Sequence, residues 1–152
     1  METMPSTASA AAEALRQIIE GDDFATPAGL LKSINSELAV RMPVGFAYSI
    51  ATYVEHARIW QDLWLSQLRG ENPARVDYGK DFPCVSAEDW PKVRKDFIKG
   101  LLDAHAIALR NPFLHGAADD AKAVRTLLKI ANHGAYHLGQ IALLKRLLRG
   151  GS

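Results

Sequence analysis

Cysteine is almost absent from the chain: Cys84 is the single one among 152 residues. One cysteine cannot build an intrachain disulfide framework, and a reducing compartment is the simpler inference, so we expect a cytoplasmic protein. The start of the chain also lacks the basic and apolar segments of a secretory leader. Nothing around Cys84 in the sequence supplies an obvious base, so the pattern does not indicate a nucleophile.

Long apolar runs and an excess of one charge are missing as well. No stretch approaches the roughly 20 apolar residues that span a bilayer, so we expect no membrane segment. The 18 basic and 17 acidic residues leave a formal net charge of +1, which gives no overall attraction for nucleic acid. No helix-turn-helix pattern is visible either. We therefore expect neither nucleic acid nor a membrane as a partner.

Strand patterns are absent, and helical periodicity takes their place. No segment alternates with period two between hairpin signals. Apolar residues instead recur at steps of three and four over four long segments, which predicts amphipathic helices over residues 7–20, 49–68, 86–110 and 119–148. We expect short helical turns within residues 29–41, an irregular connection over 70–85 and a flexible tail over 1–6. A chain of this length predicts one domain, residues 1–152. The fold class is an all-α, single-domain four-helix bundle, because four such helices must bury their apolar stripes against one another.

Capping residues place three of the expected helix starts. Ser49 precedes the second apolar pattern and suits an N-cap. Ser86, followed three residues later by Asp89, forms an imperfect capping box, so we expect the third helix to be capped by Ser86. The carboxylates of Asp119 and Asp120 suit the start of the fourth helix.

Two histidines, His133 and His137, lie four residues apart in the expected fourth helix. Residues i and i+4 share a helix face with Cβ atoms about 5–6 Å apart, so two imidazole nitrogens can reach one ion at about 2.0–2.1 Å. Both histidines lie on the flank of the apolar face, beside Ile130 and Leu144, rather than among charges. The pair is half of a metal site, although such pairs also occur by chance on exposed faces.

His56 has a similar position in the expected second helix, at the edge of the apolar face beside Tyr53 and Trp60. A single histidine there is most often a core residue bonded to a neighbour. Three histidines on the flanks of two long helices make core packing of each a weaker explanation and add one shared metal site as a second candidate. Trp60 and Trp64 fit core packing better than a platform for substrate.

Five segments of the chain together match a known pattern: 43–50 (PVGFAYSI), 54–56 (VEH), 60–65 (WQDLWL), 68–70 (LRG) and 133–141 (HGAYHLGQI). Through them the chain resembles the DinB-like (DinB/YfiT) superfamily of metal-binding four-helix bundles. The last segment is similar to the family's H-x-x-x-H-x-G-Q-I pattern. One histidine in the second helix together with two in the fourth is specific as a combination, and the similarity runs along nearly the entire chain.

This resemblance implies a compact, often homodimeric bundle that holds a nickel- or zinc-type ion through His56, His133 and His137. Three protein ligands leave a coordination position open, as in catalytic zinc sites. Such an ion can lower the pKa of bound water to about 7 or hold a thiol as its thiolate. Similar proteins are thiol-dependent transferases or isomerases that use a small thiol cosubstrate, or metal-dependent hydrolases. We therefore expect a metal-dependent enzyme acting on a small molecule.

Several assignments stay open at this stage. Tyr53 and Gln140 lie one turn from proposed ligands and can support them, or else Tyr53 is core and Gln140 is exposed. No general base is evident, since Glu55 precedes His56 and points elsewhere on the helix. A non-catalytic metal- or ligand-binding bundle and a purely structural one are the alternatives. His105 and His115 match no family position.

Overall fold

The computed structural model describes residues 7–150, and within them every regular element is helical. In chain order the helices are α1 Thr7–Glu20, α2 Pro27–Lys32, α3 Ser36–Val40, α4 Ile50–Leu68, α5 Trp90–Ala108 and α6 Asp120–Gly150. This confirms the predicted all-α class, with four long helices and the short turns expected near residues 29–41. No helix in the described part of the chain is long and apolar enough to cross a membrane. The tail predicted for residues 1–6 lies outside the described residues.

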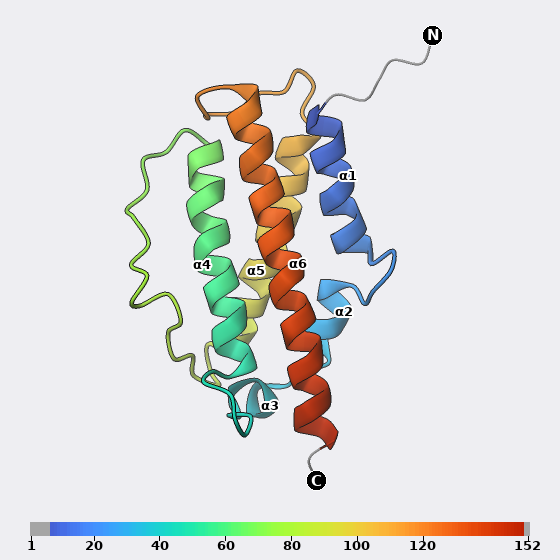
Figure 1. Cartoon of the computed structure of the whole chain (residues 1–152), viewed down its shortest axis with the longest axis vertical. Coiled ribbons are helices and arrows are strands. Elements are labelled where there is room, and N and C mark those ends of the chain that lie inside the picture. Colours follow the sequence, from blue (N-terminus) through green and yellow to red (C-terminus); the bar gives the residue numbers. More distant parts are fainter. Residues whose placement is uncertain (1–6, 151–152) are drawn as a thin grey trace.

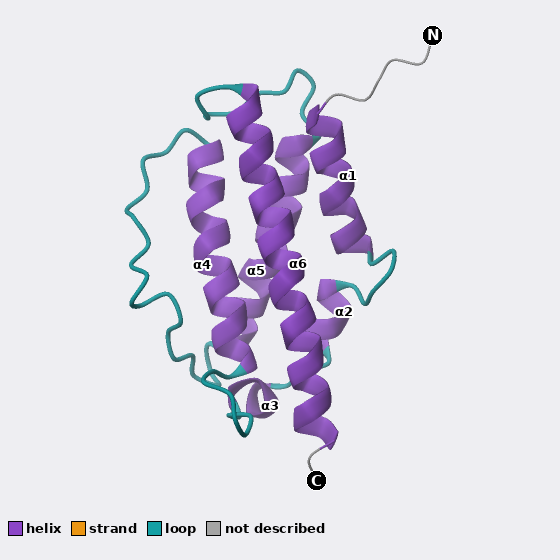
Figure 2. Cartoon of the chain, in the orientation of Figure 1, coloured by secondary structure: helices purple, strands orange, loops and turns teal. Residues whose placement is uncertain are grey.

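The four long helices run side by side along the longest axis, and α6 lies between α4 and α1 in the view of Figure 1. The helix α5 lies behind them, while α2 and α3 follow α1 toward the end where α6 finishes. The connection between α4 and α5 is long and without regular structure, and it runs back along the outer side of α4 (Figure 2). The predicted irregular segment over residues 70–85 is this connection.

The core lies where the apolar stripes of the long helices meet. Its largest fully buried side chains include Leu15, Ile50, Phe97 and Leu127, one from each long helix. Each buried side chain of this size contributes about 1.5–3 kcal/mol relative to exposure, so this packing outweighs the modest helix propensities. Trp90 is also fully buried, and its indole Nε1 donates to the carbonyl of Ile34 at 2.9 Å, which ties α5 to the segment before α3.

Two of the three predicted helix starts are confirmed and one is wrong. Ser49 caps α4, accepting from the Thr52 amide at 3.2 Å, and Asp119 caps α6, accepting from the Lys122 amide at 2.7 Å. The third long helix begins at Trp90 instead of directly after Ser86. Pro91 explains the difference, because proline lacks the N–H that an interior helical position needs and is tolerated only in the first turn. Ser86 instead closes a turn just before the helix, accepting from the Asp89 amide at 3.2 Å.

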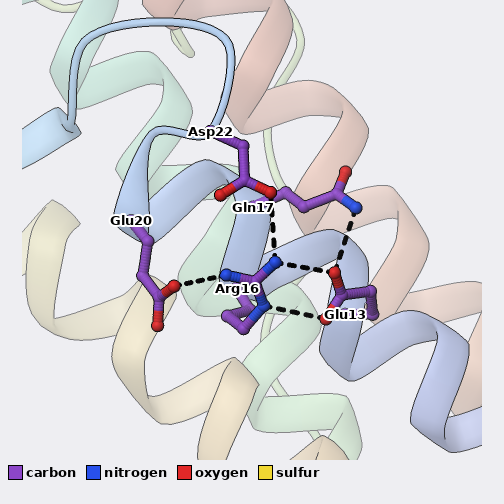
Figure 3. A network of polar contacts seen from close by, with 5 residues as sticks. All are labelled: Glu13, Arg16, Gln17, Glu20 and Asp22. Atoms are coloured by element: carbon purple, nitrogen blue, oxygen red, sulfur yellow. Dashed lines mark hydrogen bonds and ion pairs between the residues drawn. The ribbon is translucent and has the colours of Figure 1, made fainter.

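The end of α1 carries an exposed ionic network, drawn in Figure 3. Arg16 donates two hydrogen bonds of 2.8 Å to Glu13 and also pairs with Glu20 and Asp22. The hydrogen bonds from Arg16 and then from Gln17 lower the pKa of Glu13 to about 2. Because these charges face solvent, we assign the network a role in shaping the turn after α1 and little stabilisation.

Candidate metal centre

Three histidines from two helices converge on one point between α4 and α6. A ligand-capable nitrogen from each of His56, His133 and His137 lies within 4.8 Å of the other two. His56 is 6% exposed and His137 is 5% exposed, while His133 is half-buried. The spacing of His133 and His137 puts their rings on one side of α6, and the adjacent α4 brings His56 opposite them. The structure thus brings together all three residues that the sequence singled out.

Hydrogen bonds on the far side of two rings decide which nitrogens face this point. Nδ1 of His56 lies 2.8 Å from the backbone carbonyl oxygen of Asp81. A carbonyl can only accept, so Nδ1 carries the proton and Nε2 presents its lone pair. Nδ1 of His137 likewise lies 2.7 Å from the side-chain oxygen of Gln140, and its Nε2 lies 3.1 Å from Nε2 of His133. These contacts leave the Nε2 atoms of both rings available as ligands.

Burial keeps the histidines of α6 in the neutral form that binds metal. It is the largest cause of a lowered pKa for His133, to about 4, and the charges of His137 and His56 add to it while Asp81 opposes it. Burial also lowers the pKa of His137, and the hydrogen bond to Gln140 opposes that shift. At neutral pH protons therefore compete little with a metal ion for these two nitrogens.

Asp81 and Phe82 belong to the site although the sequence did not single them out. Both come from the connection between α4 and α5. Oδ2 of Asp81 accepts from the Trp60 indole at 3.1 Å and lies 3.5 Å from Nδ1 of His56. The ring of Phe82 stacks on His56 with centroids 3.8 Å apart and planes 11° apart. An acidic and an aromatic residue in an irregular connection carry no periodic signal, so only the tertiary fold identifies them.

The two candidate supporting residues take different roles. Gln140 is half-buried and holds His137, as the sequence allowed. Tyr53 is half-buried too, but its ring packs edge-on against Phe82 and lies 6.3 Å, centroid to centroid, from His137. Burial raises the pKa of its hydroxyl. Tyr53 therefore forms part of the wall beside the histidines and makes no hydrogen bond with them.

The two tryptophans of α4 face the site side of the helix and are half-buried. Trp64 packs against the core and meets the ring of His133 edge-on, with centroids 5.2 Å apart. Trp60 lies 5.2 Å from the exposed ring of Tyr78. The core packing predicted from the sequence is one role of Trp64, and its contact with His133 is another. Trp60 instead joins α4 to the connection that covers it.

The remaining polar candidates lie elsewhere or have other partners. His115 accepts from the Ala117 amide at 3.1 Å and bonds Asp120 at 2.8 Å, so it braces the turn before α6. Glu55 holds Arg58 through two hydrogen bonds of 2.7 Å, which removes it as a base for the site. Cys84 is exposed, and neither it nor His105 is a member of the histidine group.

The residues present fit a divalent metal ion that takes nitrogen ligands. The donor set consists of neutral imidazole nitrogens, which such ions prefer, and two of the rings are held by partners on their Nδ1 atoms. Among the described residues no cysteine or carboxylate joins the group as a fourth ligand. The three-histidine cluster can hold a metal ion.

Comparison with known proteins places the chain in a family. The family model described as the DinB superfamily matches residues 24–141, a span that contains all three histidines. No curated protein matches the chain, and no solved structure matches it either. The match extends over more than half of the chain, and on this basis the chain belongs to the DinB superfamily.

Proposed function

We propose that this protein binds one divalent ion, nickel or zinc, through His56, His133 and His137 and is an enzyme that uses the ion on a small molecule. The observation that carries the proposal is the convergence of three imidazoles, of which two present Nε2 because their Nδ1 atoms are bonded elsewhere. The reaction class we propose is thiol-dependent transfer or isomerisation with a small thiol cosubstrate, or hydrolysis.

Three protein ligands favour a reactive site over a structural one. Structural zinc sites are closed by four protein ligands, whereas catalytic sites keep a position for water or substrate. When bound here, the ion would supply Lewis-acid chemistry and lower the pKa of a water or thiol that it ligates. The chain's own groups hold the imidazoles of His56 and His137, keep the two imidazoles of α6 neutral and surround the site with aromatic rings.

Those rings indicate the kind of molecule that suits the site. Trp64 meets His133 edge-on, and Tyr136 meets His137 edge-on at a centroid distance of 5.1 Å while 65% exposed. An exposed aromatic ring beside a polar centre, here that of Tyr136, favours a small molecule with an apolar portion. Of the two carboxylates next to His56 in the chain or in space, Glu55 is held by Arg58 and Asp81 accepts from the Trp60 indole, so neither is free to act as a base. An ion-activated nucleophile therefore suits this site better than general-base catalysis by a side chain.

Metal binding is tested first. We expect the purified protein to bind one nickel or zinc ion per chain, measured by elemental analysis after dialysis and by calorimetry. His137→Ala should abolish stoichiometric binding, because it removes one of three ligands. His105→Ala is the matched control, a histidine on a neighbouring helix, and should bind like the unaltered protein. Equal binding by His137→Ala and the unaltered protein would refute the site.

Activity is tested with the metal-loaded protein. We expect turnover with a physiological small thiol and an electrophile, or with a hydrolysable ester, and loss of turnover in His137→Ala. A protein that binds the ion and turns over none of these substrates would instead support the alternative, a non-catalytic metal- or ligand-binding bundle.

We also propose that the protein is a homodimer, with α6 at the interface. Leu143 and Leu147 lie one turn apart on one side of this helix, and they are 54% and 47% exposed. An exposed apolar stripe of this kind suits a protein surface that pairs with another. Light scattering should give the mass of two chains, and Leu143→Glu with Leu147→Glu should give the mass of one.

A further inference from the structure

We propose that Asp81 is a positioning residue of the metal centre, which holds His56 so that Nε2 faces the two histidines of α6. The inference rests on the proposed function, because it concerns a ligand of the proposed ion. It assigns a role to the connection between α4 and α5, a segment without regular secondary structure.

Two acceptors of one residue face the same ring nitrogen. The backbone oxygen of Asp81 lies 2.8 Å from Nδ1 of His56, and its Oδ2 lies 3.5 Å from the same atom. Both side chains are nearly shielded from solvent, 7% exposed for His56 and 8% for Asp81. With two oxygens on the Nδ1 side, the tautomer with its proton on Nδ1 is favoured, and Nε2 is left as the ligand atom.

The carboxylate is itself fixed by the helix that carries His56. Trp60 lies one turn further along α4, and its indole donates to Oδ2 at 3.1 Å. Asp81 therefore spans two residues on one face of α4 and fastens the connection to it. The next residue, Phe82, stacks on the imidazole at 3.8 Å and is stacked in turn by Tyr48 at 4.5 Å, both between ring centroids. This stack opposes rotation of the His56 ring.

The charge of Asp81 also suits a site for a cation. Among the described residues no lysine or arginine pairs with this buried carboxylate, and the titratable group within 4 Å of it is the His56 ring. A buried carboxylate is costly without a compensating charge. A divalent ion on the other side of the imidazole would supply that compensation, and a carboxylate behind a ligating histidine raises the basicity of the ring.

The test compares Asp81→Ala and Asp81→Asn with the unaltered protein. Asp81→Ala removes both the bond to Trp60 and the charge, and we expect zinc or nickel affinity to fall about 10-fold or more, the usual effect of losing such a partner. Asp81→Asn keeps an oxygen for Trp60 without the charge, so its loss should be smaller. Glu88→Gln, an exposed site in the same connection, is the matched control and should not change the affinity.

A second readout uses the metal-free protein. Long-range proton–nitrogen NMR reports which nitrogen of His56 carries the proton. We expect the Nδ1–H tautomer in the unaltered protein. Asp81→Ala keeps the backbone oxygen, but the lost bond to Trp60 no longer holds that oxygen 2.8 Å from Nδ1, so we expect a mixture of the two tautomers. Trp60→Phe removes the indole donor but keeps the carboxylate, and it should also raise the fraction of the Nε2–H tautomer of His56. This measurement needs no metal and is independent of activity.

The outcomes separate this inference from the proposed function. If the unaltered protein binds no stoichiometric metal, the proposed function fails, while the tautomer of His56 still reports on Asp81. Metal affinity of Asp81→Ala within twofold of the unaltered protein overturns the inference. An unchanged tautomer in folded Asp81→Ala overturns it too, whatever the affinity, because positioning is what we infer.

Discussion

His133 is the most exposed of the three histidines, yet its pKa is lowered to about 4. The cause is its place between the edge of Trp64 and the other two imidazoles, where a charged ring would lose hydration and meet like charges. Because these features disfavour a proton on His133, its imidazole stays in the neutral form that binds a metal ion. In the competition between a proton and a metal ion for this ring, the surroundings favour the metal ion.

The lowered pKa predicts that the metal-free protein loses stability as pH falls. Unfolded histidine has a pKa near 6.5, so between pH 6.5 and about 4 the unfolded chain binds more protons than the folded one, and the unfolding free energy falls with pH. Because His133 is partly exposed and solvent screens its charge, we expect a loss on the order of 1–2 kcal/mol across that window, to which His137 contributes with the same sign. Urea unfolding of chelator-treated protein at several pH values measures it. His133→Gln should flatten the dependence, and an unchanged slope in that variant would contradict the assignment.

At the scale of helices, the contact between α4 and α5 contains a defect. Gln61 is 3% exposed, and among the described residues neither its amide nitrogen nor its amide oxygen has a hydrogen-bond partner. The side chain lies over Gly100, where a Cβ would come 1.7 Å from the amide oxygen. The absence of a side chain at Gly100 leaves room for the Gln61 amide, but the amide finds no hydrogen-bond partner among the described residues there.

This defect predicts that Gln61→Met stabilises the protein. The methionine side chain has a similar length and flexibility and carries no amide to desolvate, so we expect the unfolding free energy to rise by about 1–3 kcal/mol. Urea unfolding measures this gain in free energy, provided that the dependence of the free energy on urea concentration is the same in both proteins. Gln67→Met, at an exposed position of the same helix, is the control and should show no gain. A destabilised Gln61→Met would show that the amide has a favourable role.

The turns at the top of the bundle in Figure 1 meet through two glycines. Gly116 donates to the carbonyl of Leu68 at 2.7 Å, and a Cβ on it would lie 2.0 Å from the Gly70 nitrogen. Gly70 itself has a φ of +77°, a region that favours glycine. The end of α4 and the loop before α6 can therefore approach this closely only because neither glycine has a side chain between the two backbones.

A matched pair of alanine variants tests this contact. Gly116→Ala should lower the unfolding free energy by about 1–3 kcal/mol, because the obstacle is backbone and cannot rotate away. Gly139→Ala, inside α6 with nothing within 4 Å of the added Cβ, should raise it by about 0.5–1 kcal/mol through helix propensity. Thermal or urea unfolding of both variants gives the comparison, and a neutral Gly116→Ala would disprove the close approach.

For the whole molecule, the proposed ion would join α4 and α6 and, through Asp81, the connection outside them. Binding to the folded state alone stabilises it by about 2.7 kcal/mol when the free metal is about 100 times Kd. For a chain of this size we expect the Tm to rise by roughly 5–10 °C on adding nickel or zinc. Calorimetry of the unaltered protein and His137→Ala measures the difference. An equal rise in both would mean that the metal acts elsewhere.

The elements of this fold follow from local rules in the chain. The limits of α1, the cap at Ser49 and the start of α6 at Asp120 depend on apolar periodicity and on the residues beside each end, so the sequence predicts them. The start of α5 differs from the prediction because Pro91 outweighs the capping pattern at Ser86, although both are local signals.

The residues of the candidate site also fall into two groups, those that the sequence identifies and those that only the tertiary structure identifies. Spacing along α6 and the edge position of His56 on α4 made all three histidines candidates, and the family resemblance joined them into one site. Helical geometry puts His133 and His137 on one face of α6, whereas it does not say which side of α4 meets that face. Asp81, Phe82 and the partner of each Nδ1 were decided only by the tertiary structure. They lie on a segment without periodicity, whose path depends on contacts with residues about 20 to 30 positions away, and no local pattern records such contacts.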